Sequence, residues 1–351
     1  MSFSSFWQRQ KKGLFRDRYS SSLTLLLSIA ALYFTSRFLS WSFFNADFEG
    51  ESRLDCTSGG ACWVFVKMHL SAFLYGSFYP KDETWRPLLL FFLLIALPLI
   101  ALFSRGWLRK YAFLALFLVL PPLGGWLLLG GAGLTAIESS RIGGLSLTLV
   151  ISYVGILSSL PFGILLALGR RSSLPMVKAT SIAFIEFWRG VPLITVLFMA
   201  SVMLPLFLPQ DFDPDRFDKL FRCLIGVTLF SSAYMAEVVR GGLQSIEKGQ
   251  YEAAKALSFS YFAMMRYVIL PQALSRVIPG IVNNFIGLFK DTTLVMIIGM
   301  FDLLGVVQSS VTNSEWLSYI VEGYLFAGFI FWVFCFGLSR MSVLLERRYH
   351  H

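Results

Sequence analysis

The chain has 351 residues, of which 56% are hydrophobic, 16% aromatic and only 15% charged, with a mean hydropathy of +0.66. This composition is too apolar for an ordinary soluble domain, and apolar runs such as residues 88–103 lack the alternation of a membrane β-barrel. The net charge of +9 indicates basic loops beside membrane helices rather than nucleic-acid binding, because no basic stripe interleaved with aromatics lies outside the apolar segments.

Apolar runs of bilayer length predict an all-α integral membrane protein with about eight spanning helices. The polar and basic first 19 residues precede the first run without an A-x-A-like cleavage site, so we expect a retained helix and no cleaved signal peptide. In chain order, the predicted spans are 23–43, 87–103, 111–129, 145–168, 192–208, 220–239, 281–298 and 319–338.

The distribution of basic residues predicts the orientation of these spans. With a cytoplasmic N-terminus, the inner segments hold 19 lysines and arginines and the outer regions hold nine. Because basic residues accumulate in cytoplasmic loops, both termini are predicted to be cytoplasmic.

The distinctive motifs divide the chain near residue 140. Residues 1–140 are predicted to be an N-terminal extension with three spans and an outer loop at 44–86. Residues 141–351 are predicted to be a five-span core with a cytoplasmic loop at 240–276. In the outer loop, Cys56 and Cys62 flank a Gly-Gly turn and face an oxidising compartment, which favours a small disulfide clip over two free thiols.

The loop at 240–276 is polar within an otherwise apolar protein, and its sequence predicts two short helices. Gly249 and Gln250 provide a flexible entry, and Glu252 lies in a first helical turn, where a negative charge complements the helix dipole. The alanines that follow make a slim helix that could enter a cleft on another protein. A second stretch, 261–270, is expected to stop at Pro271.

The segment GQYEAAKALS, followed after eleven further residues by Leu-Pro, resembles the EAA signature of binding-protein-dependent ABC importers. The resemblance implies a coupling helix that inserts into a groove of the cytoplasmic ATPase. Ser258 departs from it, since the family usually has glycine there, and serine in a left-handed conformation costs about 1 kcal/mol. The residues to which the resemblance assigns ATPase coupling are Gly249, Glu252, Ala253, Ala254, Ser258, Leu270 and Pro271.

Four further elements resemble the polar-amino-acid branch of this family, closest to the M-type permeases of general L-amino-acid transporters. They are Gly144-Leu145 with Thr148-Leu149, the run from Phe187 to Leu193, Ala233 to Gly241, and Pro279 to Leu294. The resemblance implies three partners: an ABC ATPase dimer, an extracytoplasmic amino-acid-binding protein, and a second permease that is a related chain or a second copy. The chain would then lie in a bacterial inner membrane, surrounded by lipid.

Two charged pairs near these elements are expected to have structural roles. Glu186 and Arg189 are three residues apart and could pair on one helix face at the inner boundary. Glu237 and Arg240 have the same spacing at the start of the loop, which favours a hinge or anchoring role over substrate contact.

A zwitterionic amino acid crossing the bilayer needs polar partners for both charged ends. The candidates are Ser231, Ser232, Asn283 and Asn284, with Thr148 and Ser152 as weaker ones; interhelical hydrogen bonding is the alternative role. Adjacent helical positions point about 100° apart, so only one of the two asparagines is expected to face the pathway.

The chain contains no phosphate-binding G-x-x-x-x-G-K-[ST] loop, no Ser/His/Asp grouping and no histidines with metal-ligand partners. We therefore expect no catalytic residue, metal or cofactor in the chain itself, with ATP and Mg²⁺ used by the partner ATPase. The sequence predicts a permease of an ATP-driven amino-acid importer working by alternating access. An ion-driven secondary transporter, the alternative, predicts intramembrane carboxylates and no docking loop.

Overall fold

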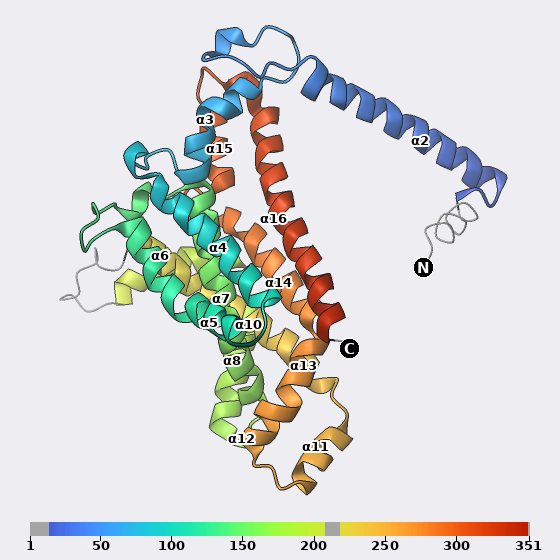
Figure 1. Ribbon diagram of the computed structural model, residues 1–351, viewed down its shortest axis with the longest axis vertical. Coiled ribbons are helices and arrows are strands. Elements are labelled where there is room, and N and C mark those ends of the chain that lie inside the picture. The colour runs from blue at the N-terminus through green and yellow to red at the C-terminus, as the bar shows by residue number, and fades with distance from the viewer. Residues whose placement is uncertain (1–13, 208–217, 350–351) are drawn as a thin grey trace. The chain divides into compact units, whose positions relative to one another are not determined.

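The computed structural model describes residues 14–207 and 218–349, and among them it contains helices and turns but no β-strand (Figure 1). The chain divides into two compact units. The first comprises Met1–Met68 and Val311–Gly323, and the second comprises His69–Ser310 and Tyr324–His351.

The helices are α2 (Arg18–Leu39), α3 (Trp63–Tyr75), α4 (Trp85–Phe103), α5 (Gly106–Leu114), α6 (Leu120–Leu129), α7 (Gly144–Arg170), α8 (Pro175–Gly190), α9 (Leu193–Phe198), α10 (Lys219–Gln244), α11 (Lys248–Ala256), α12 (Tyr261–Met264), α13 (Leu270–Arg276), α14 (Ile278–Asp291), α15 (Leu303–Val311) and α16 (Ile320–Tyr349). Single π-helical turns follow α2, α5, α9 and α12, at Ser40–Phe44, Ala115–Val119, Met199–Met203 and Met265–Ile269.

Seven helical segments in the described part are long and apolar enough to cross a membrane. They are Arg18–Phe44, Lys81–Phe103, Gly106–Leu129, Gly144–Arg170, Lys219–Gln244, Ile278–Ile298 and Leu317–Arg348. An eighth is a pair of helices, Pro175–Gly190 and Leu193–Phe207, bent by 104° at a short break. The predicted all-α membrane fold with about eight spans is therefore confirmed. The fifth predicted span corresponds to the second half of the bent pair, and its last residue, Leu208, lies outside the described residues.

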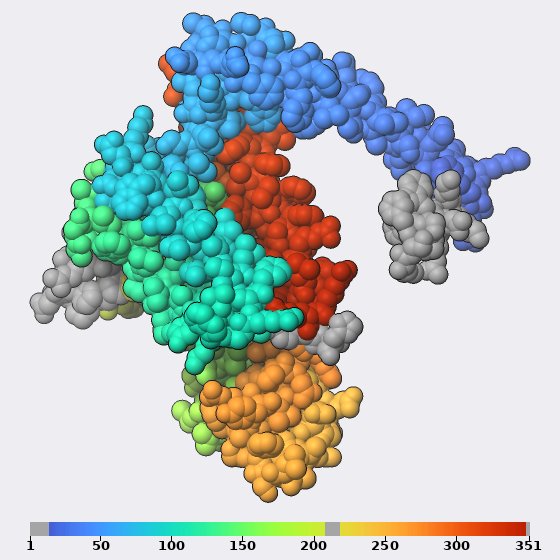
Figure 2. All heavy atoms as spheres, viewed as in Figure 1, coloured from blue at the N-terminus to red at the C-terminus, as the bar shows by residue number. Residues whose placement is uncertain are grey.

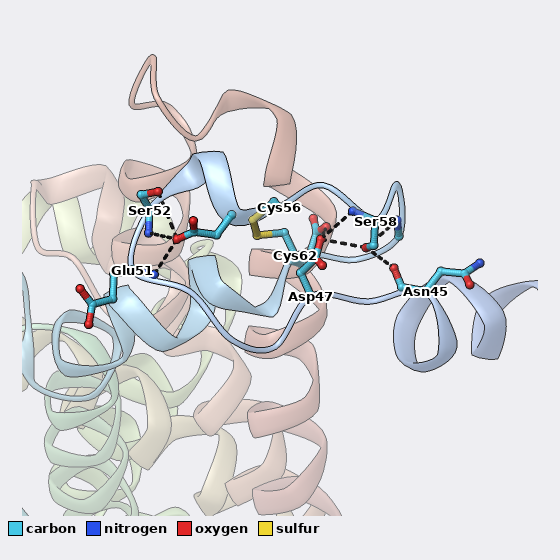
Figure 3. The surroundings of a disulfide bond; sticks show 10 residues. Asn45, Asp47, Glu51, Ser52, Cys56, Ser58 and Cys62 are labelled. Carbon is cyan, nitrogen blue, oxygen red and sulfur yellow. Dashed lines mark hydrogen bonds between the residues drawn. A yellow bond between two sulfur atoms is a disulfide. The ribbon is translucent and has the colours of Figure 1, made fainter.

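The first unit is organised by polar contacts in the outer loop (Figure 3). Cys56 and Cys62 are joined in a disulfide, with their Cα atoms 5.7 Å apart. Asp47 accepts hydrogen bonds from the Ser58 amide (3.0 Å) and hydroxyl (2.8 Å). The hydrogen bond from the amide is the main cause of the lowered pKa of Asp47. The buried Glu322 accepts a hydrogen bond from the Cys62 amide at 3.0 Å, which ties this loop to the start of α16.

The core of the second unit is the packing of α7 against α10. Three small residues on α7, Gly155, Ser159 and Gly163, are four residues apart and lie along one face. A Cβ atom on Gly163 would lie 2.6 Å from Cγ of Met235 in α10. Helices in membranes pack closely through such small residues, because lipid provides no hydrophobic drive for their association.

The α4 helix begins with a buried charge. Arg86 is 1% exposed and pairs with Glu83 at 2.8 Å, and it also donates hydrogen bonds to the carbonyl (2.9 Å) and hydroxyl (2.6 Å) oxygens of Thr135. A buried arginine is tolerated only where such partners compensate its lost hydration. These bonds hold the segment after α6 against the start of α4.

The start of α7 is held by hydrogen bonds to the segment that leads into α15. Gly144 has φ +58° and its amide donates to the carbonyl of Phe301 at 2.9 Å. Thr148, a weaker pathway candidate, accepts a hydrogen bond from the Leu303 amide at 3.1 Å. Asp302 is buried beside it and caps α15 by accepting from the Gly305 amide at 2.9 Å; burial raises the pKa of Asp302 to about 6.

Gly144→Ala is expected to destabilise the protein by about 3 kcal/mol or more. The new Cβ atom would lie 2.3 Å from the carbonyl oxygen of Phe73 and 2.8 Å from that of Ala72, in a left-handed backbone conformation. Thermal unfolding of the purified chain in detergent measures the loss. The control is Gly125→Ala in α6, where a Cβ atom meets nothing within 4 Å. Replacing a helical glycine with alanine there should raise stability by about 0.5–1 kcal/mol. Equal unfolding temperatures for the two variants would contradict the interpretation.

Candidate functional site

The loop after α10 folds as two helical segments at one end of the second unit. Figure 1 shows α11 and α12 side by side beyond the end of α8, and in Figure 2 the orange atoms of this region form a separate lobe. Helix α11 spans Lys248–Ala256, with Glu247 at its N-cap. The expected flexible entry at Gly249 and Gln250 is therefore wrong, because both residues already belong to the first turn. The expected place of Glu252 is also wrong: the helix starts earlier, so its first turn contains no acidic residue.

One face of α11 is anchored to its own chain. Ala254 is buried among apolar residues from α7, α10 and α13, and Gln272 donates to the side-chain oxygen of Gln250 at 3.1 Å. Arg171, just after α7, donates to the Tyr251 hydroxyl at 3.0 Å and lies over its ring, 5.5 Å from the centroid. These contacts give α11 a fixed position relative to α7 and α10.

The opposite face of α11 is open. Glu252 and Ala253 are exposed, and a Cβ atom on Gly249 would meet nothing within 4 Å. Large apolar side chains continue this surface past the end of the helix, including Leu257 at 74% and Phe262 at 70% exposure. The group is completed by the exposed Phe259, Tyr261 and Tyr267. Several large exposed apolar side chains within one short segment, beside charged ones, indicate a protein-binding surface.

The bend after α11 is left-handed in spite of its serine. Ser258 has φ +58°. Its amide donates to the carbonyl of Lys255 at 2.8 Å, and the Phe259 amide donates to the carbonyl of Ala254 at 3.1 Å. This pair of bonds is a Schellman motif, which usually has glycine at the left-handed position. Ser260 then caps α12 by accepting from the Ala263 amide at 3.3 Å.

The helix that follows does not stop at Pro271, so this expectation is corrected. Helix α12 continues through the π-helical turn Met265–Ile269 into α13, and Pro271 lies in the first turn of α13. Proline lacks an amide hydrogen, and its ring clashes with the carbonyl four residues earlier. The π turn directly before Pro271 is wider than an α-helical turn, so the helix there needs neither the missing proline hydrogen bond nor the contact that the ring would make. The helix can therefore continue to Arg276.

A network of charges joins α7, α8 and α10 close to this loop. The carboxylate of Glu237 accepts from Arg170 at 2.9 Å and from Arg240 at 2.8 Å, and Arg189 lies 3.7 Å away. The predicted pairing of Glu186 with Arg189 is replaced by another: Glu186 pairs with Arg170 at 2.9 Å. The last turn of α7 inserts an arginine between α8 and α10, an arrangement that spacing within one helix could not predict.

The predicted pathway residues lie in different environments. Ser231 and Ser232 are buried in α10, and their hydroxyls donate to carbonyls of the same helix, those of Val227 at 2.7 Å and Thr228 at 2.6 Å. On α14, Asn283 is exposed and Asn284 is half-buried. Lys290 was not among the predicted pathway residues, although its exposed side chain lies seven residues after Asn283 on α14. Its position inside an apolar run was the signal that could have identified it.

Comparison with known proteins identifies the family. Residues 159–351 match the model of the binding-protein-dependent transport system inner membrane component. The chain belongs to this family. It is the membrane component of such a transport system, so ATP hydrolysis is the task of another subunit.

Relatives of the permease fall into two lengths. It is 50% identical to the inner membrane amino-acid ABC transporter permease protein YhdY of Escherichia coli K12, over 97% of this chain and 92% of that protein. It is 37% identical to the glutamate/glutamine/aspartate/asparagine transport system permease protein BztC of Rhodobacter capsulatus, over 97% and 93%. The probable amino-acid ABC transporter permease protein YckA of Bacillus subtilis is 32% identical but covers only 62% of this chain with 92% of its own length.

Ser258→Gly is expected to stabilise the bend after α11 by about 1 kcal/mol, because glycine adopts the left-handed conformation without steric cost. Hydrogen exchange of the amides from Lys255 to Ala263 measures this locally. Ser260→Ala is the matched control. It removes the cap of α12 and should lower the local stability by about 0.5–2 kcal/mol, so that the amides exchange faster. Faster exchange in the Ser258→Gly variant would refute the strain at this serine.

Proposed function

We propose that the permease translocates amino acids into the cytoplasm, driven by an ABC ATPase that docks on α11. The exposed face of α11, held in place by its buried face, is the observation that carries the proposal. Support for amino acids as the substrate class comes from the two relatives that match nearly the whole chain, since both are named as amino-acid transport permeases.

The proposed assembly contains the partners that an importer needs. The core has one α11, so an ATPase dimer requires a second permease, either a related chain or a second copy. An extracytoplasmic amino-acid-binding protein delivers the substrate at the opposite end. ATP and Mg²⁺ belong to the ATPase, and both termini of the permease lie in the cytoplasm of a cell with an inner membrane. The distribution of 19 inner against nine outer basic residues supports this orientation.

The division into an extension (1–140) and a core (141–351) is likewise a proposal. The family model begins at residue 159, and relatives such as YckA match only 62% of this chain with nearly all of their length. A family model that begins after the extension, together with a relative that matches so much less of this chain, supports an accessory role for the extension.

A bulky residue on the open face of α11 should uncouple the transporter. Ala253→Trp is expected to leave the permease folded, because Ala253 is exposed, and to reduce uptake and binding-protein-stimulated ATP hydrolysis at least tenfold. Both rates are measured in proteoliposomes that contain the permease, its partner permease and the ATPase, with the binding protein added. The control is Ala179→Trp, which adds the same bulk at an exposed position of α8. Unchanged coupling in Ala253→Trp, or equal loss in both variants, would count against docking at α11.

The polar face of α14 is the proposed surface of the substrate pathway. Asn283, Gly287 and Lys290 recur at spacings of four and three residues, so they share one face of this membrane helix. Contact between the charged side chain of Lys290 and lipid, within a membrane helix, would be energetically costly. This face must therefore be covered by a partner protein or by the water of a pathway, and a lysine with an amide suits the carboxylate of an amino acid.

Asn283→Ala is expected to raise the KM for amino-acid uptake about tenfold, the value of one or two lost hydrogen bonds to substrate. Asn284→Ala, the half-buried neighbour, should leave the KM within a factor of two. Uptake by proteoliposomes over a range of substrate concentrations measures both. A larger effect at Asn284 than at Asn283 would place the pathway on another face of α14.

A further inference from the structure

A basic patch forms where the turn between α4 and α5 meets the end of α16. We define the elbow patch as Arg105, Lys110, Arg347 and Arg348. The guanidinium of Arg348 donates to the carbonyl of Leu102 near the end of α4, which brings together two segments almost 250 residues apart. Both belong to the second unit, and Figures 1 and 2 show the turn between α4 and α5 beside the last turns of α16.

The charge of the elbow patch is poorly balanced by the chain itself. Residues 104–111 contain no acidic residue, and in the last turns of α16 the half-buried Glu346 is the one carboxylate among the described residues. The first turn of α5 also lacks an acidic residue, and its N-cap, Arg105, provides no side-chain cap. The free amides at a helix N-terminus carry a partial positive charge, so they add to that of the side chains.

The location of the elbow patch identifies the source of an anion. Phe103 ends one apolar segment of bilayer length and Gly106 begins the next, so the turn between them lies at a membrane surface. Trp107 is 73% exposed and contacts Tyr111 edge-on, with ring centroids 5.8 Å apart. Exposed tryptophan and tyrosine at the end of a span lie at the depth of the lipid head groups.

We propose that the elbow patch binds the phosphate of an anionic phospholipid, with α5 providing amides and α16 providing guanidinium groups. Basic pockets between membrane helices recognise such head groups. The lipid would bridge α4 and α5, which precede the family-matched region, and α16, its last helix. The proposal does not depend on the solute that the permease carries.

Titration of the purified permease in detergent with phosphatidylglycerol, cardiolipin or phosphatidylcholine, followed by native mass spectrometry, tests the proposal. Wild type should bind the two anionic lipids in preference to phosphatidylcholine. Arg105→Gln and Arg347→Gln, one from each segment, should each weaken anionic-lipid binding about fivefold, and the double variant about 30-fold. Arg348 is left intact because its bond to Leu102 is part of the fold.

The matched control is the double variant Lys178→Gln and Arg266→Gln, which removes two exposed basic residues from α8 and from the π turn before α13. It should bind anionic lipid as wild type does. Equal affinity of the wild type and the Arg105→Gln/Arg347→Gln variant for anionic lipid would overturn the proposal. So would displacement of the lipid by millimolar inorganic phosphate, since the patch would then recognise a soluble anion.

Discussion

The close packing of α7 on α10 is the contact on which the second unit depends. It is possible because Gly155, Ser159 and Gly163 present no bulk on one face of α7. The hydroxyls of Ser158 and Thr228 lie 3.0 Å apart across the same interface, so polar groups there are satisfied by the neighbouring helix. Lipid competes poorly for such surfaces, since it can neither fill them as closely nor provide donors. Helices α8, α9, α13 and α14 then pack around this pair.

The long helices were predictable because a bilayer allows few solutions. A run of about 20 apolar residues must be helical, and every predicted span has a counterpart in the structure. Two short helices, α3 and α15, were not predicted, because a window of bilayer length does not detect elements of 13 and nine residues. The 104° bend between α8 and α9 was also not predicted from the sequence. Val191 and Pro192 mark where a helix ends and another begins, but the angle depends on packing against α10.

The candidate site shows which local rules fail when tertiary contacts oppose them. Ser258 adopts a left-handed conformation because the two bonds of the Schellman motif and the buried Ala254 over-determine the bend. Pro271 remains in a helix because the π turn before it removes the clash. The family resemblance led us to expect glycine at the first position, and the proline itself predicted a helix end at the second. In both, burial of one face against α7 and α10 outweighs a local cost of about 1–3 kcal/mol.

The charge network explains how a force on α11 could reach the spans under the proposed function. An exposed ion pair is worth less than about 1 kcal/mol and breaks easily. Glu237 differs, because its side chain is 17% exposed and three arginines from three helices surround it. Removing α10 from α7 would leave several charges partly buried and unpaired, which costs more than the loss of any single pair. Helix α8 joins the network through the 54% exposed Glu186, which pairs with Arg170, and through the longer 3.7 Å contact of Arg189 with Glu237, and both are more easily released. Helices α7 and α10 should therefore move as one body with α11, anchored through Tyr251 and Arg171, while α8 has more freedom to shift against them.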